Sequence, residues 1–209
     1  MADRPGVRAT YERIADHFSM TREHPWPDVE SFCAEQRADT ALDIGCGNGR
    51  HTALLAERSR RAIGVDASRS LLSIARERVP EAMFVEGDAA SLPVATEAAD
   101  LALYVATLHH LPDRRLRVRS LDELARVLVP GGTALISVWS TTHDRFDSHD
   151  ETMGFDTEVD WTLPGGETVP RFYHIYAPEE FEADLTESDL SIVNSFLAMG
   201  NCYAIVESE

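Results

Sequence analysis

Short apolar runs alternate with amphipathic helical patterns through the middle of the chain. The runs are short enough for buried strands, and they are found at residues 40–45, 61–66, 82–86, 100–107 and 133–139. Between them, apolar residues recur at helical spacing at 50–58, 68–79 and 114–128. Strands that alternate with helices predict an α/β fold built on a mostly parallel sheet.

The pattern changes after residue 140. Residues 141–170 are polar, acidic and interrupted by Gly and Pro, which predicts a long loop near the substrate site. The dipeptide Gly200-Asn201 predicts a hairpin turn. The remaining predicted elements are a strand at 171–176, a helix at 178–188 and strands at 191–199 and 203–206. We expect the last two strands to form an antiparallel pair.

The length of 209 residues, 44% of them hydrophobic, fits one domain over 1–209 with an N-terminal helical cap at 1–39. No apolar run reaches eighteen residues and residues 1–5 carry no apolar signal segment, so we expect a cytoplasmic protein with no membrane contact. The cysteines at 33, 46 and 202 form no CxxC pair, which predicts neither a disulfide framework nor a zinc site.

Acidic residues outnumber basic ones by 36 to 19, the formal net charge is −17, and every basic residue is Arg. Acid excess without lysine is typical of proteins that stay soluble in concentrated salt, so we expect a halophilic archaeon as the source. At 1 M salt the Debye length is about 3 Å. The net charge therefore does not exclude a nucleic-acid partner, because local contacts decide binding.

A glycine-rich segment, Asp43-Ile44-Gly45-Cys46-Gly47-Asn48-Gly49, follows the first predicted strand and opens a helix. Its glycines allow a tight turn, and the helix start offers N–H groups to an anion such as an amino-acid carboxylate. Asp43 favours a cationic ligand over a pyrophosphate. Asp66 and Asp88 end the next two strands, at positions suited to ribose hydroxyls and an adenine amine. A structural turn or a dinucleotide site is the alternative, although the dinucleotide pattern requires Gly where Arg50 stands.

This pattern resembles the class I S-adenosylmethionine-dependent methyltransferases over roughly residues 11–206. The resemblance implies a Rossmann-like, seven-stranded sheet with an antiparallel last strand, S-adenosyl-L-methionine as cofactor, and no metal ion in this chain. The cofactor-binding residues that it implies are Asp43, Gly45, Cys46, Gly47, Asn48, Gly49, Asp66, Ala67, Asp88, Ala89 and Val105.

Narrower motifs lie outside the glycine-rich segment. In many such enzymes a helix like the one that carries Tyr11, Ile14 and Phe18 covers the cofactor site. The narrower motifs are residues 21–27, Ser137-Val138-Trp139, Arg171-Phe172-Tyr173-His174 and Gly200-Asn201-Cys202-Tyr203. Together they resemble the tRNA wobble-uridine carboxymethyl methyltransferases, although Cys202 stands where that family implies Trp. The resemblance implies methyl esterification of 5-carboxymethyluridine in the tRNA anticodon loop.

The carboxylate of such a substrate is ionised near neutral pH and needs a cationic clamp more than a strong base. Arg22 and Arg171 are the candidate clamps, and Trp139 is the candidate residue for stacking on the uracil. His109 and His110, at the end of the fourth strand, are candidate hydrogen-bond donors. The competing interpretations are surface ion pairs for the arginines, core packing for Trp139 and shaping of the cofactor pocket for the histidines.

Two clusters of arginine, at 58–61 and 114–119, stand out in this acidic chain. The second could contact phosphates of the anticodon stem, but we favour a solvated helix face with ion pairs to neighbouring acids.

The third predicted strand contains Met83-Phe84-Val85 and would lie at the edge of the sheet. An apolar edge strand tends to pair with another chain unless it is covered. The family resemblance implies a small zinc-ribbon activator protein that adds a strand to this edge. The alternative is that Met83 and Phe84 pack on a helix.

Two other functions stay open. One is a methyltransferase of the same fold that acts on a quinone or another metabolite, although the acidic segment 141–170 does not favour the large apolar pocket expected of it. The other is a non-catalytic adenosylmethionine-binding protein that serves a partner.

Overall fold

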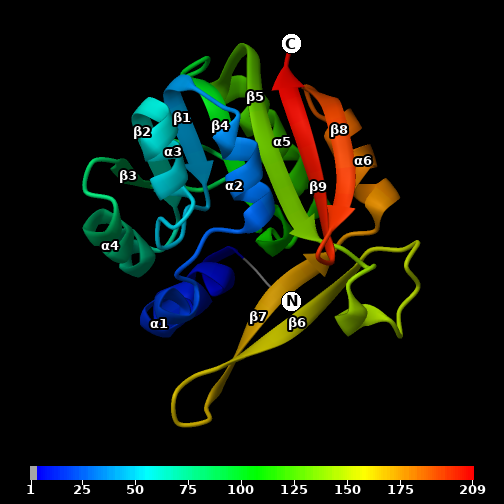
Figure 1. Cartoon of the computed structure of the whole chain (residues 1–209). Helices are drawn as coiled ribbons and strands as arrows, with labels where there is room; N and C mark the ends of the chain where they lie inside the picture. Colours follow the sequence, from blue (N-terminus) through cyan, green and yellow to red (C-terminus); the bar gives the residue numbers. More distant parts are fainter. Residues whose placement is uncertain (1–3) are drawn as a thin grey trace.

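The computed structural model describes residues 4–209, and a seven-stranded sheet forms its centre (Figure 1). The strand order is β3-β2-β1-β4-β5-β9-β8, with β9 antiparallel to both of its neighbours and the other pairs parallel. The predicted α/β class and antiparallel last strand are therefore confirmed. The strands are β1 (Ala38–Ile44), β2 (Ser59–Asp66), β3 (Met83–Glu86), β4 (Ala99–Val105), β5 (Leu128–Trp139), β8 (Leu190–Ala198) and β9 (Asn201–Ser208).

Helices cover both faces of this sheet (Figure 1). Successive strand residues point to opposite faces. Leu103 accordingly packs with α2 and α3, whereas its neighbour Tyr104 packs with α5 and α6. None of the helices within 4–209 is long and apolar enough to cross a membrane. The longer helices are α1 (Arg4–Thr21), α2 (Pro27–Ala34), α3 (Thr52–Arg58), α4 (Arg69–Arg78), α5 (Arg114–Val127) and α6 (Pro178–Glu187).

Local sequence signals explain where several helices begin and end. Ser68 precedes α4, and its hydroxyl accepts the N–H of Leu71 at 3.2 Å; Asp113 plays the same part before α5. Helix α5 ends at Val127, and β5 begins at Leu128 rather than at the predicted 133, so that it includes Pro130-Gly131-Gly132. The early start pairs Leu128 with Ala99 ahead of a shift in register.

The predicted loop at 141–170 is wrong in its second half. The chain forms η2 (Asp144–Phe146) and then an antiparallel hairpin of β6 (Phe155–Thr162) and β7 (Thr168–Ile175). Val159 and Trp161 are buried, while the acids at alternate positions of β6, Asp156, Glu158 and Asp160, are exposed. This period of two was present in the sequence, but its solvent-facing positions are mostly acidic, which gave the segment the composition of a loop. The hairpin extends below the sheet beside α1 (Figure 1).

Helix α1 is attached to the start of α4 by one carboxylate. Glu12 accepts the backbone N–H groups of Arg69 at 2.6 Å and of Ser70 at 3.1 Å. These N–H groups lack partners within their own helix, so the carboxylate acts as a cap supplied by another element. Burial alone would raise the pKa of Glu12, but the hydrogen bonds from Ser70 and Arg69 outweigh it and lower the pKa.

We expect Glu12→Ala to lower the free energy of unfolding by about 1 kcal/mol at pH 7, the usual effect of losing a cap. Because the folded-state pKa of Glu12 lies below its ordinary value, its contribution is present above that value and disappears as pH falls through the lowered pKa. Denaturant unfolding between pH 3 and 7 measures this. Glu77→Ala, an exposed position on α4, is the control. A Glu12→Ala effect that did not change with pH would contradict the capping role.

Candidate functional site

A cavity of about 740 Å³ lies where the carboxyl ends of the central parallel strands meet. Ligand sites of open α/β sheets form at this edge. Nine of the eleven predicted cofactor residues line it, namely Gly45, Cys46, Gly47, Asn48, Asp66, Ala67, Asp88, Ala89 and Val105. Asp43 and Gly49 do not.

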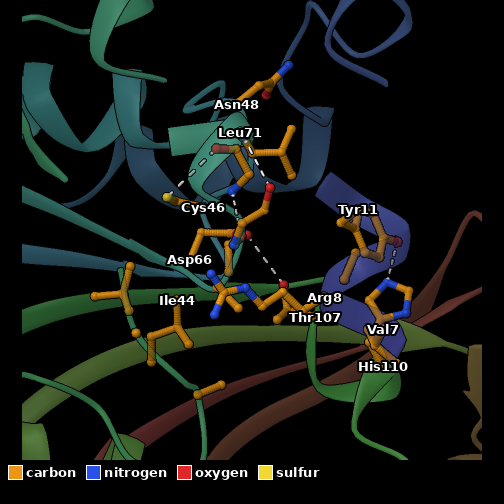
Figure 2. Close-up of a pocket in the computed structure, with 18 of the residues that line it drawn as sticks. Val7, Arg8, Tyr11, Ile44, Cys46, Asn48, Asp66, Leu71, Thr107 and His110 are labelled. Carbon is orange, nitrogen blue, oxygen red and sulfur yellow. Dashed lines mark hydrogen bonds between the residues drawn. The ribbon is translucent and has the colours of Figure 1, made fainter. Parts of the chain in front are cut away.

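Asp66 joins two loops of the cavity wall. One carboxylate oxygen accepts the N–H of Gly47 at 2.8 Å, and the other accepts the N–H of Ser68 at 2.8 Å. The glycine-rich segment after β1 is thereby attached to the turn that opens α4. Figure 2 shows Asp66 beside the segment that carries Cys46 and Asn48. Burial raises the pKa of Asp66, and the hydrogen bonds from Ser68 and Gly47 oppose that rise.

Asp43 and Gly49 support the cavity from behind. Asp43 is 2% exposed and accepts the Thr52 hydroxyl at 2.6 Å, at the start of α3. Burial raises the pKa of Asp43 to about 7. Gly49 has φ of 79°, and a Cβ there would lie 3.1 Å from the Cβ of Ala75, so glycine allows α4 to pack closely. In this structure the two residues act on the cavity through packing, hydrogen bonding and charge, and their direct contact with a cofactor stays a prediction.

Helix α1 forms the cover of the cavity. Val7, Arg8, Tyr11 and Phe18 line it from this helix. The sequence predicted Tyr11 and Phe18 as cover residues but missed Val7 and Arg8, which the same helical spacing could have found. In Figure 2, Tyr11 points toward His110. Their side chains are hydrogen-bonded, with 2.8 Å between the Tyr11 hydroxyl and Nε2.

Beside His110 lies an aromatic cluster that contains the buried Arg171, with Tyr173 and Trp161 against its guanidinium. Arg171 is 7% exposed and donates from Nη1 to the Tyr173 hydroxyl at 2.6 Å, while its buried Nε has no hydrogen-bond partner. Among the residues that the structure describes, no carboxylate lies within 4 Å of this guanidinium. A buried cation without a counter-ion is costly, and the free donor marks a place for an anion. The buried donor of Arg171 is compatible with the predicted carboxylate clamp, which stays a prediction.

Trp139 also belongs to this aromatic cluster. Its ring stacks on Tyr173 with 4.7 Å between centroids and an interplanar angle of 20°. Both rings belong to a small apolar cluster that includes Phe146 and Ile175. The structure therefore brings Trp139 to Arg171 by way of Tyr173, a residue that the sequence analysis quoted only as part of a motif.

Both histidines are neutral bases held in fixed tautomers. His110 Nδ1 lies 2.9 Å from the Phe172 carbonyl, which can only accept, so Nδ1 carries the proton and Nε2 accepts from Tyr11. His109 Nδ1 accepts the backbone N–H of Trp139 at 3.0 Å. Burial lowers the pKa of His110 to about 4 and holds the pKa of His109 well below its ordinary value. Both ring nitrogens of His110 are engaged with Tyr11 and β7, so the histidine positions these elements here, and its role as a substrate donor stays a prediction.

Arg22 and Arg171 meet at a residue that sequence reasoning missed. Their guanidinium carbons lie 5.3 Å and 4.7 Å from the Trp161 ring, one arginine following α1 and the other on β7. Trp161 itself donates from its indole N–H to His17 Nδ1 at 3.0 Å. The alternation of residues along β6 was the signal that could have identified Trp161 as a buried side chain.

The predicted basic cluster at 114–119 is partly neutralised within the chain. Arg114 pairs with Asp184 and Glu187, and the 4% exposed side chain of Arg117 donates to the Leu111 carbonyl and lies 3.9 Å from Glu180. The interpretation as a solvated, ion-paired face thus fits Arg114, whereas Arg117 is buried against the chain. Among residues 4–209, no group of three His, Cys, Asp or Glu side chains could hold a metal ion.

Comparison with known proteins places this site in a family. A family model described as a methyltransferase domain matches residues 42–136. The mouse tRNA (carboxymethyluridine(34)-5-O)-methyltransferase ALKBH8 is 41% identical over 135 residues, which cover 64% of this chain and 20% of the mouse protein. The Schizosaccharomyces pombe tRNA (carboxymethyluridine(34)-5-O)-methyltransferase is 29% identical, over 96% of this chain and 95% of that protein. The chain thus spans about a fifth of the mouse relative's length.

Solved structures share the fold. A SAM-dependent methyltransferase from Methanosarcina mazei has a TM-score of 0.71 at 21% identity, over 88% of this chain and 98% of that chain. A structure of the complex between the Haloferax volcanii Trm112 methyltransferase activator and a methyltransferase gives a TM-score of 0.71 at 17% identity, over 97% of both chains.

The chain belongs to the S-adenosylmethionine-dependent methyltransferases. The predicted family resemblance and the predicted cofactor are thereby confirmed. The lining of the cavity fits the cofactor. Asp66 ends β2 and Asp88 follows β3, and both line the cavity. Val65, Leu71 and Val105 supply its apolar walls. When bound, S-adenosylmethionine supplies an electrophilic methyl group. The buried negative charge of Asp43 behind the loop favours such a cation.

We expect Asp43→Asn to stabilise the methyltransferase increasingly as pH rises. The folded-state pKa of about 7 lies above the ordinary 3.8, so the stability contribution of Asp43 is complete below 3.8 and is lost as pH rises through 7. The amide oxygen of Asn can still accept from Thr52, so the variant should gain on the order of 1–3 kcal/mol at pH 8. Its affinity for S-adenosylmethionine should fall.

Denaturant unfolding at pH 4 to 8 and cofactor titration test both expectations. Asp39→Asn is the matched control, because Asp39 is an exposed acid that pairs with Arg60 and Arg61. A stability difference that stayed flat between pH 5 and 8 would show that Asp43 is not a buried, strained charge.

Proposed function

We propose that this methyltransferase esterifies the carboxylate of 5-carboxymethyluridine at the wobble position of tRNA. The observation that carries the proposal is the buried guanidinium of Arg171, which has an unpartnered Nε and no carboxylate of the described chain beside it. Sequence similarity to relatives that bear this enzyme name supports the substrate. The acid-rich composition without lysine supports a site of action in the cytoplasm of a salt-adapted cell.

The geometry suits a carboxylate nucleophile. Arg171 lies next to Tyr173, whose ring centroid is 4.5 Å from that of His110, and His110 lines the cofactor cavity. An anion on Arg171 would therefore lie beside the cavity that holds the methyl donor. The transfer takes an ionised carboxylate to an ester and releases no proton, so it needs orientation rather than a base. Neutral histidines with lowered pKa values are consistent with this requirement.

The aromatic rings around Arg171 supply the second requirement. Arg171 lies against the rings of Tyr173 and Trp161, and Trp139 stacks on Tyr173, so a largely desolvated aromatic cluster surrounds the guanidinium. Such rings suit a single extruded base, which stacks on aromatic side chains. An apolar quinone would gain nothing from the unpaired guanidinium, so this cluster favours an anionic nucleoside over an apolar metabolite.

The direct test uses purified full-length protein, S-adenosylmethionine and tRNA from cells in which the gene is deleted. Mass spectrometry of the nucleosides should show 5-carboxymethyluridine converted to its methyl ester. Arg171→Ala should lower kcat/KM by about 100-fold, as expected when one partner of a buried charge pair is removed. Its affinity for S-adenosylmethionine should stay within twofold.

Arg60→Ala, which alters an exposed ion pair with Asp39, is the matched control and should retain full activity. An unchanged nucleoside profile, in the presence of an activator, would overturn the tRNA proposal and leave the small-molecule methyltransferase as the leading function. Normal methylation by Arg171→Ala would instead refute only the clamp.

We further propose that a small zinc-ribbon activator adds a strand to β3. β3 ends the sheet, as predicted, and Met83 is 58% exposed. The N–H of Gly87 donates to Asp66 on β2, so the alternate backbone groups of Phe84 and Glu86 face the free edge. The Phe84 carbonyl there accepts only the Arg76 side chain, at 3.0 Å. The Phe84 ring packs inward against Gly64 of β2, whereas Met83 stays exposed at the edge.

The activator complex at this edge has its own test. Met83→Glu should reduce co-purification with a Trm112-type activator at least tenfold, because it places a charge at a strand-pairing edge. Met153→Glu, another exposed methionine at 67% exposure, should have no effect. Thermal melting of each free variant should match that of the unaltered chain. Full complex formation by Met83→Glu would remove β3 as the docking edge.

A further inference from the structure

Three arginines distant in sequence come together beside the mouth of the cofactor cavity. Arg22 follows α1, Arg50 follows the glycine-rich segment, and Arg78 ends α4. Arg78 Nη1 lies 3.5 Å from the Arg22 carbonyl, to which Asn48 also donates at 3.0 Å. The loop that carries Arg22 is thus attached both to α4 and to the glycine-rich segment.

The charges of this cluster are not neutralised within the described part of the chain. Among the carboxylates of residues 4–209, none lies within 4 Å of Arg22, Arg50 or Arg78, although the sequence has 36 acidic residues for 19 arginines. Burial lowers the pKa of Arg50 to about 10; the charges of Arg22 and Arg78 contribute to this lowering, and the more distant charge of Asp43 opposes it. The three guanidinium groups therefore repel one another, and an anion between them would relieve that repulsion.

The arginine cluster adjoins the aromatic cluster around Arg171. Arg22 stacks on Trp161, the ring that Arg171 also contacts, at 5.3 Å and 4.7 Å respectively. Arg50 lies 5.3 Å from the Trp26 ring. A line of positive charge interleaved with aromatic rings thus leads from Arg171 through Arg22 to Arg50 and Arg78. Strand-binding proteins use this combination to follow a nucleic-acid backbone.

We propose that Arg22, Arg50 and Arg78 form a subsite for the RNA phosphates that flank the nucleotide held at Arg171. The inference rests on the proposed function for its RNA ligand, but RNA binding can be measured without methyl transfer. The subsite differs from the arginine cluster at 114–119, part of which pairs with acids of α6. The carboxylate of the cofactor is the other anion within reach, because Arg50 lines the cavity whereas Arg22 and Arg78 do not.

The test is carried out on Arg78→Ala, since Arg78 lies outside both the cofactor cavity and the aromatic cluster around Arg171. Fluorescence anisotropy with an unmodified anticodon stem-loop should show about a tenfold rise in Kd, the expected loss for a charged hydrogen bond. The slope of log K against log salt should fall by roughly 0.7 to 0.9, corresponding to one lost phosphate contact. A merely structural role for Arg78 at the end of α4 would not change that slope.

Arg37→Ala is the matched control, because Arg37 is exposed and precedes β1 at the opposite end from the cavity. It should leave both Kd and the salt slope unchanged. S-adenosylmethionine titration of Arg78→Ala should match the unaltered chain. A loss of cofactor affinity equal to the loss of RNA affinity would overturn the proposal and assign the cluster to the cofactor carboxylate.

The two proposals fail in different ways. If Arg78→Ala binds RNA normally with an unchanged salt slope while the unaltered enzyme methylates tRNA, the phosphate subsite is wrong and the function stands. If RNA binding weakens as expected but no carboxymethyluridine ester forms, the subsite stands and the proposed reaction is wrong.

Discussion

The site depends on the pair of hydrogen bonds that the Asp66 carboxylate accepts. The carboxylate accepts one N–H from the loop after β1 and another from the turn after β2, so two adjacent loops share one anchor. Parallel strands bring such loops to the same edge of the sheet, but they do not fix the distance between them. The two hydrogen bonds fix that distance beside the cavity. The turn after β2 opens α4, and Glu12 attaches the cover helix α1 to α4.

The distribution of arginine separates structure from function in this acidic chain. Several surface arginines form ion pairs with acids of the chain, as Arg69 does with Glu86 and Arg60 with Asp39. Such exposed pairs contribute little energy each. The informative arginines are those at the carboxyl edge of the sheet that have no acid of the described chain beside them. Their unpaired charges indicate anionic ligands, whereas the net charge of −17 indicates adaptation of the surface to the solvent.

The second sheet shows how composition can hide structure. The strands β6 and β7 supply Trp161, Arg171 and Tyr173, and so they build most of the aromatic cluster around the Arg171 guanidinium. The sequence identified Arg171 through a motif but treated the segment before it as a loop. Its partner strand was hidden because alternate acidic positions face solvent, which lowers the mean hydropathy without changing the period of two.

The sequence by itself determined the α/β alternation, the glycine-rich turn, the acids that end successive strands and the two candidate clamp arginines. These features are local, because backbone turning, helix starts and strand burial leave their marks within a few residues. Only the tertiary structure decided that Asp43 supports the loop from behind, that both histidines are neutral, and that Arg22, Arg50 and Arg78 converge. The physical reason is that burial and Coulomb interactions depend on distance in space, and residues far apart along the chain set them together.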